Sequence, residues 1–579
     1  MRLVSLRFTL YLLSALFGCF LYFWLTPYIW PAVEIPKHIS ALEAERIARA
    51  SLQRAGITIP GKYRNAVAFK VNDYEKEYLE QRLGVRQALC IMQTTSPVYT
   101  WHVRWFKPQC KEDFSVDISL DGQFINYEHH LPDEAVQQTC DSLRLVKQFI
   151  AQVGGVNLTN YVAEIVATLP GNGHPELWFE WRRKNRLLGN ALQSVQVVVV
   201  GNQVTRFSRY LYMQSPYFEQ HILRVVRNER LYKYGLILEG ILLLVGVITV
   251  IIGIVTRTCH WRCGVAPTIM IVLFSLLTAL NSLPKAYANF DTGYSWSGFW
   301  WHHAGMVALD LLLLALKIYL LVLAAEWIYR RAFPQHRPLA YWFTSSGLAS
   351  QAGRNRLLLG YWLIPVQMAC VTLIYLLANQ FLHGWVSSSL GYSGLITSWL
   401  PWSPALNSGL FAAIFEEFLF RVLTISWLKR LVKYDWLAVL IPAIMWGLVH
   451  INHSNQPFLV RNFEVTLWGI IFGYIFLRYG PLPALVAHAG YDVIIDGMGF
   501  LTANSWLLRL NFVVMLLIIL LPLGLSLWWG RRTGLAPEST LPPDNQSLSD
   551  LLKQHKAERR PPALPPETEQ TDPTLPLTS

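Results

Sequence analysis

Long apolar runs occur near the N-terminus and again in the second half of the chain, and a segment of mixed polarity separates them. The first run covers about 6–30 after Arg2 and Arg7 and has no small-residue cleavage site, so residues 1–33 are interpreted as an uncleaved signal-anchor helix. Further runs long enough to cross a bilayer follow from about residue 233. We expect about ten transmembrane helices in all, and those after the anchor are placed at 234–255, 265–283, 299–328, 357–381, 404–428, 436–451, 465–477, 481–498 and 506–529.

Residues 34–230 have a different pattern, in which charged residues interrupt short apolar segments. Residues 114–120 alternate between apolar and polar positions, as a strand with one buried face does, and residues 195–200 are nearly all valine. This pattern predicts a soluble α+β domain inserted between the anchor and the other membrane helices.

The soluble domain is predicted to contain two helix-plus-hairpin repeats, at 34–130 and 131–230. A helical stretch opens each half, at 44–56 and at 145–154, and a tyrosine follows each at the same spacing from a glycine. Strand-like segments and a turn then follow in both halves. The arrangement is similar to PepSY-type domains, which are associated with protease propeptides.

Composition supports a membrane protein. The chain of 579 residues is 53% hydrophobic and 15% charged, whereas a soluble domain has about 25% charged residues. This excludes a purely soluble globular protein. The net charge of +12 is concentrated beside apolar runs rather than in an aromatic-interleaved patch, so nucleic acid is not an expected partner. Seven scattered cysteines do not define a disulfide scaffold.

The basic residues also predict an orientation. Alternate connections between the predicted spans are basic, and the opposite connections are almost uncharged. Because cytoplasmic loops carry an excess of Lys and Arg, the N-terminus and the proline-rich tail at 531–579 are predicted to be cytoplasmic. The tail is also predicted to be disordered. The soluble domain is then extracytoplasmic, and residues 231–530 form the multi-pass membrane domain.

Three polar clusters lie within the apolar runs, where ionisable groups are functional candidates because they are costly to bury. The first contains Glu416, Glu417 and Arg421. Glu417 and Arg421 are four residues apart on one helix face and can form an ion pair. Glu416 points about 100° away from Glu417 and is therefore the carboxylate left for proton transfer.

The other two clusters contribute histidines. His450 ends the segment that includes Trp446, and His488 lies one helical turn before Asp492. A carboxylate and a histidine could deprotonate a water molecule, or could bind a metal that does so. The other His and Asp could then stabilise an oxyanion or complete the metal coordination.

These motifs resemble those of the CPBP family, also called ABI, which are intramembrane endopeptidases that include the CAAX prenyl protease type 2. The resemblance covers about 355–500 and is most specific in the Glu416-Glu417-x-x-x-Arg421 motif. It implies peptide-bond hydrolysis in which Glu416 and His450 activate water while His488 and Asp492 support the oxyanion. The family has been described both as metalloproteases and as glutamate-dependent proteases. A divalent metal such as zinc would be held by Glu416, His450 and His488.

Two positions depart from the family pattern. Trp446 replaces the usual phenylalanine and keeps an aromatic wall, whereas Asp492 replaces a frequent asparagine. An ionised carboxylate cannot donate a hydrogen bond to an oxyanion, so Asp492 is expected to be protonated, to bind metal or to orient His488.

The expected partners are the lipid bilayer and a membrane-associated protein or peptide substrate. A non-proteolytic scaffold or immunity-type protein, which would bind a partner through the soluble repeats, is the alternative. A transporter would use the same charged residues as a proton relay, but it predicts an inverted repeat of spans, which the sequence does not show. The oligomeric state cannot be predicted from the sequence.

Overall fold

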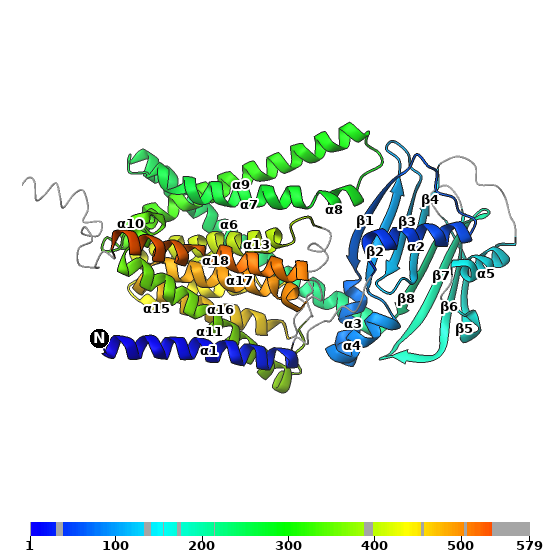
Figure 1. Cartoon of the computed structure of the whole chain (residues 1–579), viewed down its shortest axis with the longest axis horizontal. Helices are drawn as coiled ribbons and strands as arrows, with labels where there is room; N and C mark the ends of the chain where they lie inside the picture. Colours follow the sequence, from blue (N-terminus) through cyan, green and yellow to red (C-terminus); the bar gives the residue numbers. More distant parts are fainter. Residues whose placement is uncertain are drawn as a thin grey trace, which may run out of the picture.

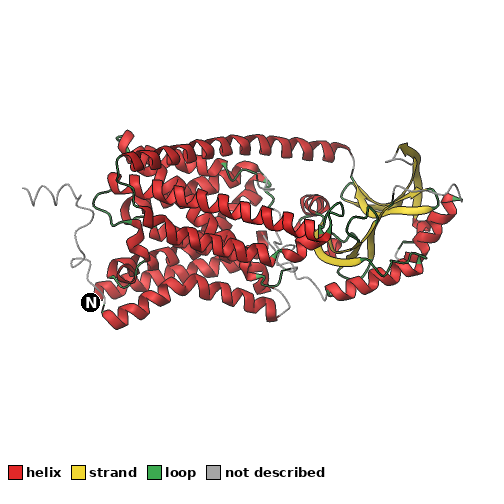
Figure 2. Cartoon of the chain, turned by 90° about the horizontal axis from the view of Figure 1, so that it is seen from above, coloured by secondary structure: helices red, strands yellow, loops and turns green. Residues whose placement is uncertain are grey.

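The computed structural model has a helical bundle at one end and a β-sheet domain at the other (Figures 1 and 2). It describes residues 2–29, 39–132, 141–153, 156–170, 175–213, 215–386, 398–452, 457–502 and 506–534. Almost all of the predicted disordered tail at 531–579 therefore lies outside the described residues.

Eight helices among the described residues are long and apolar enough to cross a membrane. A ninth apolar helix, Asp435–Leu448, is shorter. The chain is therefore an integral membrane protein, and the expected count of about ten is confirmed only as far as these eight. The eight candidate spans are Thr9–Ile29, Tyr217–Val255, Trp261–Asn281, Trp296–Ala332, Gln351–Leu382, Phe458–Tyr479, Leu482–Leu501 and Trp506–Thr533.

The helical bundle combines the N-terminal helix α1 with the described helices that follow the soluble domain. Its bounds are α1 Arg2–Ile29, α6 Ser215–Val255, η2 Trp261–Gly264, α7 Val265–Asn281, α8 Leu283–Ala288, α9 Trp296–Ala332, η3 Leu339–Phe343, α10 Ser345–Leu348, α11 Gln351–Leu382, α13 Trp402–Glu416, η4 Glu417–Ile425, α14 Ser426–Leu431, α15 Asp435–Leu448, α16 Phe458–Tyr479, α17 Leu482–Thr502 and α18 Trp506–Thr533. The predicted domain boundary at residue 230 falls inside α6, so this one helix leads from the soluble domain into the bundle.

The soluble domain is built on one antiparallel sheet of eight strands in the order β1-β2-β3-β4-β8-β7-β6-β5. Its elements are α2 Ala41–Arg54, β1 Arg64–Val71, α3 Asp73–Leu83, α4 Val85–Thr94, β2 Tyr99–Phe106, β3 Asp113–Ser119, β4 Phe124–His130, α5 Ser142–Val153, η1 Leu158–Asn160, β5 Tyr161–Pro170, β6 Pro175–Leu188, β7 Ala191–Val200 and β8 Gln203–Tyr212.

Each half of the sheet has four strands and follows one helix, α2 or α5, but only the first half contains α3 and α4. The halves are thus four-stranded meanders rather than single hairpins, joined where β4 pairs with β8. The duplication itself stays a prediction.

In strand β3, alternate side chains enter the hydrophobic core of this domain. Phe114, Val116 and Ile118 enter its hydrophobic core. The residues between them point to the other face, as the two-residue period of a strand requires. There the buried Asp117 contacts Lys70 Nζ at 3.3 Å and His102 Nδ1 at 2.6 Å, so its charge is balanced.

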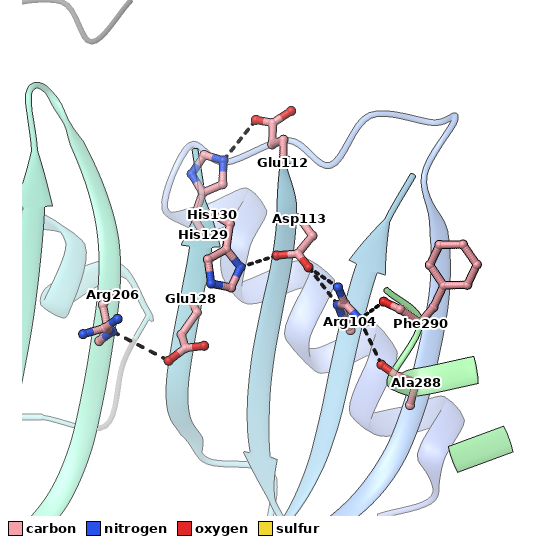
Figure 3. Close-up of polar contacts among 9 residues, drawn as sticks. All are labelled: Arg104, Glu112, Asp113, Glu128, His129, His130, Arg206, Ala288 and Phe290. Atoms are coloured by element: carbon pink, nitrogen blue, oxygen red, sulfur yellow. Dashed lines mark hydrogen bonds and ion pairs between the residues drawn. The ribbon is translucent and has the colours of Figure 1, made fainter. Parts of the chain in front are cut away.

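The same polar face ties the sheet to the bundle (Figure 3). Asp113 binds both His130 and Arg104, and the Arg104 guanidinium donates to the backbone oxygens of Ala288 at 3.2 Å and Phe290 at 2.7 Å. These carbonyls belong to the connection between α7 and α9. The Phe290 ring also stacks on Phe106, with ring centroids 4.9 Å apart. The connection thereby covers the β1–β2 end of the sheet.

A buried carboxyl group in α3 predicts that the stability of the soluble domain depends on pH. Burial raises the pKa of Glu75 from 4.5 to about 7, although the backbone N–H of Leu211 donates to it. Between these pH values the unfolded chain loses this proton while the folded domain keeps it. Stability should therefore fall as pH rises through this window, by about 3 kcal/mol at most.

The Glu75→Gln variant should lose this pH dependence and be more stable than wild type at pH 7.5. Hydrogen exchange of the β8 amides in the full-length protein, corrected for intrinsic rates at pH 5 and 7.5, measures it. Asp73→Asn, at the exposed start of α3, is the control and should keep the wild-type pH dependence. An equal dependence in Glu75→Gln and wild type would contradict the prediction.

Candidate active site in the membrane domain

The two adjacent carboxylates lie where α13 passes into the π-helical segment η4. Glu416 ends α13 and Glu417 begins η4. Single π-turns within helices are rare and frequent at functional sites. As expected, Glu417 and Arg421 form an ion pair, with Oε1 and Nη1 3.1 Å apart and side chains 0% and 2% exposed. Glu416 points elsewhere, toward α15 and α17.

Trp446 and His450 approach Glu416 from the end of α15. The Trp446 indole N–H donates a hydrogen bond to Glu416 Oε2. His450 Nδ1 lies 2.8 Å from the Trp446 carbonyl oxygen. Because a carbonyl only accepts, Nδ1 carries the proton, and in the neutral ring Nε2 is a lone-pair acceptor. This Nε2 lies 3.8 Å from Glu416 Oε2.

His488 enters the same space from α17 and is surrounded by carboxylates. Its Nδ1 is 2.8 Å from Glu417 Oε1, and its Nε2 is 3.2 Å from Asp492 Oδ2 and 3.8 Å from Glu416 Oε2. A carboxylate thus faces each ring nitrogen, an arrangement that a doubly protonated imidazolium satisfies. Asp492 therefore fits the expected role of orienting His488.

Glycines let these helices approach closely enough for the side chains to meet. A Cβ atom at Gly409 in α13 would lie 2.9 Å from the backbone nitrogen of Val493 in α17. A Cβ atom at Gly469 in α16 would lie 2.8 Å from Ala443 Cβ in α15. Because real Cβ atoms do not come so near, both positions need glycine to keep the present helix spacing.

The structure brings all six predicted site residues into one network. Glu416 faces both histidines, while Arg421, Glu417, His488 and Asp492 form a chain of opposite charges behind it. The planar Arg421 guanidinium also lies over the Trp446 ring, 3.9 Å from its centroid. The catalytic roles of these residues stay predictions.

The same residues are not arranged as a metal site. In the part of the chain that the structure describes, no three His, Cys, Asp or Glu side chains are arranged to hold a metal ion. Glu416 Oε2 already accepts the Trp446 N–H, and His488 Nε2 already faces Asp492. Direct ligation would require these contacts to open. The predicted metal set of Glu416, His450 and His488 does not fit a metal in this arrangement.

Two charged pairs lie near the site, and of their four residues the sequence pattern indicated only Glu239, as a residue that pairs or extends to the membrane surface. Arg461 and Glu464 in α16 form an ion pair of 2.6 Å, and Glu464 is buried. Lys317 in α9 lies 3.7 Å from Glu239 and 3.7 Å from the ring centroid of Phe415, the residue before Glu416. Charged residues inside apolar runs were the available signal.

Comparison with known proteins places this site in a recognised sequence region. Residues 397–494 match the family described as type II CAAX prenyl endopeptidase Rce1-like. A stretch of 137 residues is 21% identical to the sporulation-killing factor biosynthesis protein SkfC of Bacillus subtilis (strain 168). That similarity covers 24% of this chain and 27% of the relative, so the chain spans about a quarter of the curated relative's length. No solved structure matches this chain.

The matched residues include the whole network described above, from Glu416 in α13 to Asp492 in α17. They also include the three motifs whose spacing resembles the CPBP family. Within the membrane domain, residues 397–494 are therefore similar to the Rce1-like family of type II CAAX prenyl endopeptidases.

Proposed function

We propose that the membrane domain is an intramembrane endopeptidase that hydrolyses peptide bonds of membrane-associated protein substrates with water activated by Glu416 and His450. The observation that carries this proposal is the convergence of two histidine Nε2 atoms on one carboxylate oxygen, each at 3.8 Å. This separation is too long for a direct hydrogen bond, and a single water molecule can bridge it.

The bridging water has two acceptors on its enzyme side. It donates one hydrogen to Glu416 Oε2 and the other to His450 Nε2, which leaves an oxygen lone pair for the substrate carbonyl carbon. As the new C–O bond forms, Glu416 takes a proton from the water. Glu416 then returns this proton to the leaving nitrogen as the C–N bond breaks. The indole N–H of Trp446 holds Glu416 in the required orientation.

His488 is assigned to the substrate oxygen. The Nε2–H of a protonated ring lies 3.2 Å from Asp492 and is shared between this carboxylate and the substrate carbonyl oxygen when substrate binds. A donor fixed in a low-dielectric site strongly stabilises the negative charge that develops on that oxygen. Glu417 and Asp492 act as positioning residues because they contact the two nitrogens of this ring. Arg421 balances the charge of Glu417 behind it.

The substrate is proposed to be a protein or peptide held by the membrane, because the site lies among membrane helices. We also propose, from the basic connections, that the soluble domain is extracytoplasmic and that the N-terminus and tail are cytoplasmic. With this orientation, a prenylated cytoplasmic substrate is not assumed.

Digestion of a library of membrane-anchored peptides by the purified protein in lipid vesicles tests the activity. Wild type should cleave some members, with one ¹⁸O atom from labelled water in the new carboxyl group. The His450→Phe variant keeps an aromatic ring but has no water acceptor, and it should lower the rate by about 10²-fold or more. Cleavage of the library at equal rates by both proteins would contradict the role of His450.

Two further results distinguish a glutamate mechanism from a metal-dependent one, and a protease from a scaffold protein. Dialysis against a chelator should leave the rate unchanged, and a loss that zinc restores would replace the glutamate mechanism by a metal-dependent one. If wild type cleaves no member, the result supports the alternative, a scaffold or immunity-type protein that binds a partner through its soluble domain.

A further inference from the structure

A cavity of about 450 Å³ lies where the soluble domain meets the first turns of α6, away from the candidate active site. Its lining is formed by Gln81, Arg82, Tyr217, Gln220, Leu223 and Arg224. All but one of these side chains are polar, and two are cationic. The cavity therefore favours a ligand that carries negative charge.

The two arginines face the cavity without a carboxylate partner. Arg224 donates to the oxygens of Gln81 and Gln220, both uncharged, and both guanidinium groups lie within 6 Å of the Tyr217 ring. Among the described residues, neither arginine forms an ion pair, and the amide nitrogen of Gln81 is buried without a hydrogen-bond partner. The Glu77 carboxylate lies 3.9 Å from His221 Nδ1.

The cavity is also at the level where the membrane helices end. Arg86, four residues after Arg82, donates to the carbonyl oxygen of Pro27, two residues before the end of α1, at 3.5 Å. Arg227, three residues after Arg224, lies over the ring of Phe458, the first residue of α16, at 4.1 Å. Figure 1 shows α3 and α4 next to this end of the bundle. Headgroups of the bilayer lie at the ends of spanning helices.

Apolar side chains beside the cavity face outward on the same turns of α6. Leu223, which lines the cavity, is 70% exposed, and Phe218 and Ile222 are exposed next to it. A helix surface that combines arginines with exposed apolar residues is typical of segments that lie in the headgroup layer. Guanidinium groups bind phosphate oxygens through paired N–H donors.

We propose that this cavity binds the phosphate of an anionic phospholipid headgroup, and that the bound lipid fastens the soluble domain to the membrane surface. Arg82 and Arg224 contact the phosphate oxygens, Gln81 and Gln220 donate to the remaining oxygens, and Leu223 lies against the start of the acyl chains. The inference does not depend on proteolytic activity, so it can be tested without a substrate.

Native mass spectrometry of the full-length protein, released from nanodiscs of mixed phosphatidylglycerol and phosphatidylcholine, tests the site. Wild type should retain phosphatidylglycerol selectively. The Arg82→Gln/Arg224→Gln variant should retain about tenfold less, since each basic residue near the surface contributes substantially to anionic-lipid binding. The Arg144→Gln/Lys147→Gln variant removes the same charge from α5, outside the cavity, and should retain as much as wild type. Arg82→Lys/Arg224→Lys should restore part of the selectivity.

Three results would overturn the proposal. The first is equal retention by wild type and the Arg82→Gln/Arg224→Gln variant. The second is the same loss in the α5 control, which would make the effect one of net charge. The third is displacement of the retained lipid by millimolar inorganic phosphate, which would identify a site for the free anion instead. Thermal unfolding of each variant separates lost binding from lost folding.

Discussion

The Glu416→Gln variant should fold as wild type does and lose about 10³-fold or more in kcat, with little change in KM. Glutamine has the size of glutamate, and its amide oxygen can still accept the hydrogen bond from the Trp446 indole. It cannot take a proton from water at neutral pH. The substitution therefore leaves the site assembled and removes only the proton acceptor, so the loss is expected in the chemical step rather than in binding.

Steady-state cleavage of one peptide from the library, with thermal unfolding measured in parallel, distinguishes these effects. Asp310→Asn, which removes a carboxylate from an exposed position of α9, is the matched control and should remain within about twofold of wild type. The role of Glu416 as the base would be refuted if the folded Glu416→Gln protein kept a kcat within tenfold of wild type.

Ionisable residues inside apolar runs indicated the members of the candidate site, and local spacing predicted which of them form pairs. Glu417 and Arg421, and likewise His488 and Asp492, are four residues apart, so each pair had to share a helix face, and the structure pairs both. Because adjacent residues of a helix point about 100° apart, the sequence also predicted different directions for Glu416 and Glu417. The resemblance to the CPBP motifs indicated that these separate helices meet.

Contacts between helices were harder to predict because they depend on packing. Trp446 was expected only to supply an aromatic wall, yet its N–H binds Glu416, which depends on how α15 packs against α13. The sequence pattern did not predict the π-helical segment that follows Glu416. In the soluble domain, local alternation predicted strands, but not that β4 and β8 join both halves into one sheet.

The second large effect is expected on stability, in the Arg421→Met variant. Methionine fills a similar length but carries no charge, so the fully buried Glu417 loses its arginine partner and keeps only His488, 2.8 Å away. Breaking one side of a buried ion pair destabilises by about 3–5 kcal/mol when the remaining charge is uncompensated, and the contact with His488 places this variant at the lower end of that range. The variant also loses the stacking of the guanidinium on Trp446. Unfolding of the purified protein in mixed detergent micelles measures the change.

Removal of both charges tests whether the pair acts mainly by mutual neutralisation. Among the described residues, the terminal nitrogens of Arg421 have no aligned hydrogen bond, so the interaction with Glu417 is mostly one of charge. The Glu417→Gln/Arg421→Met variant should therefore recover most of the lost stability, as replaced buried ion pairs do. Its amide oxygen can still accept from His488 Nδ1, but an uncharged acceptor favours the imidazolium less, so catalysis should remain impaired. If the double variant is no more stable than Arg421→Met, packing of Arg421 on Trp446, rather than its charge, holds these helices together.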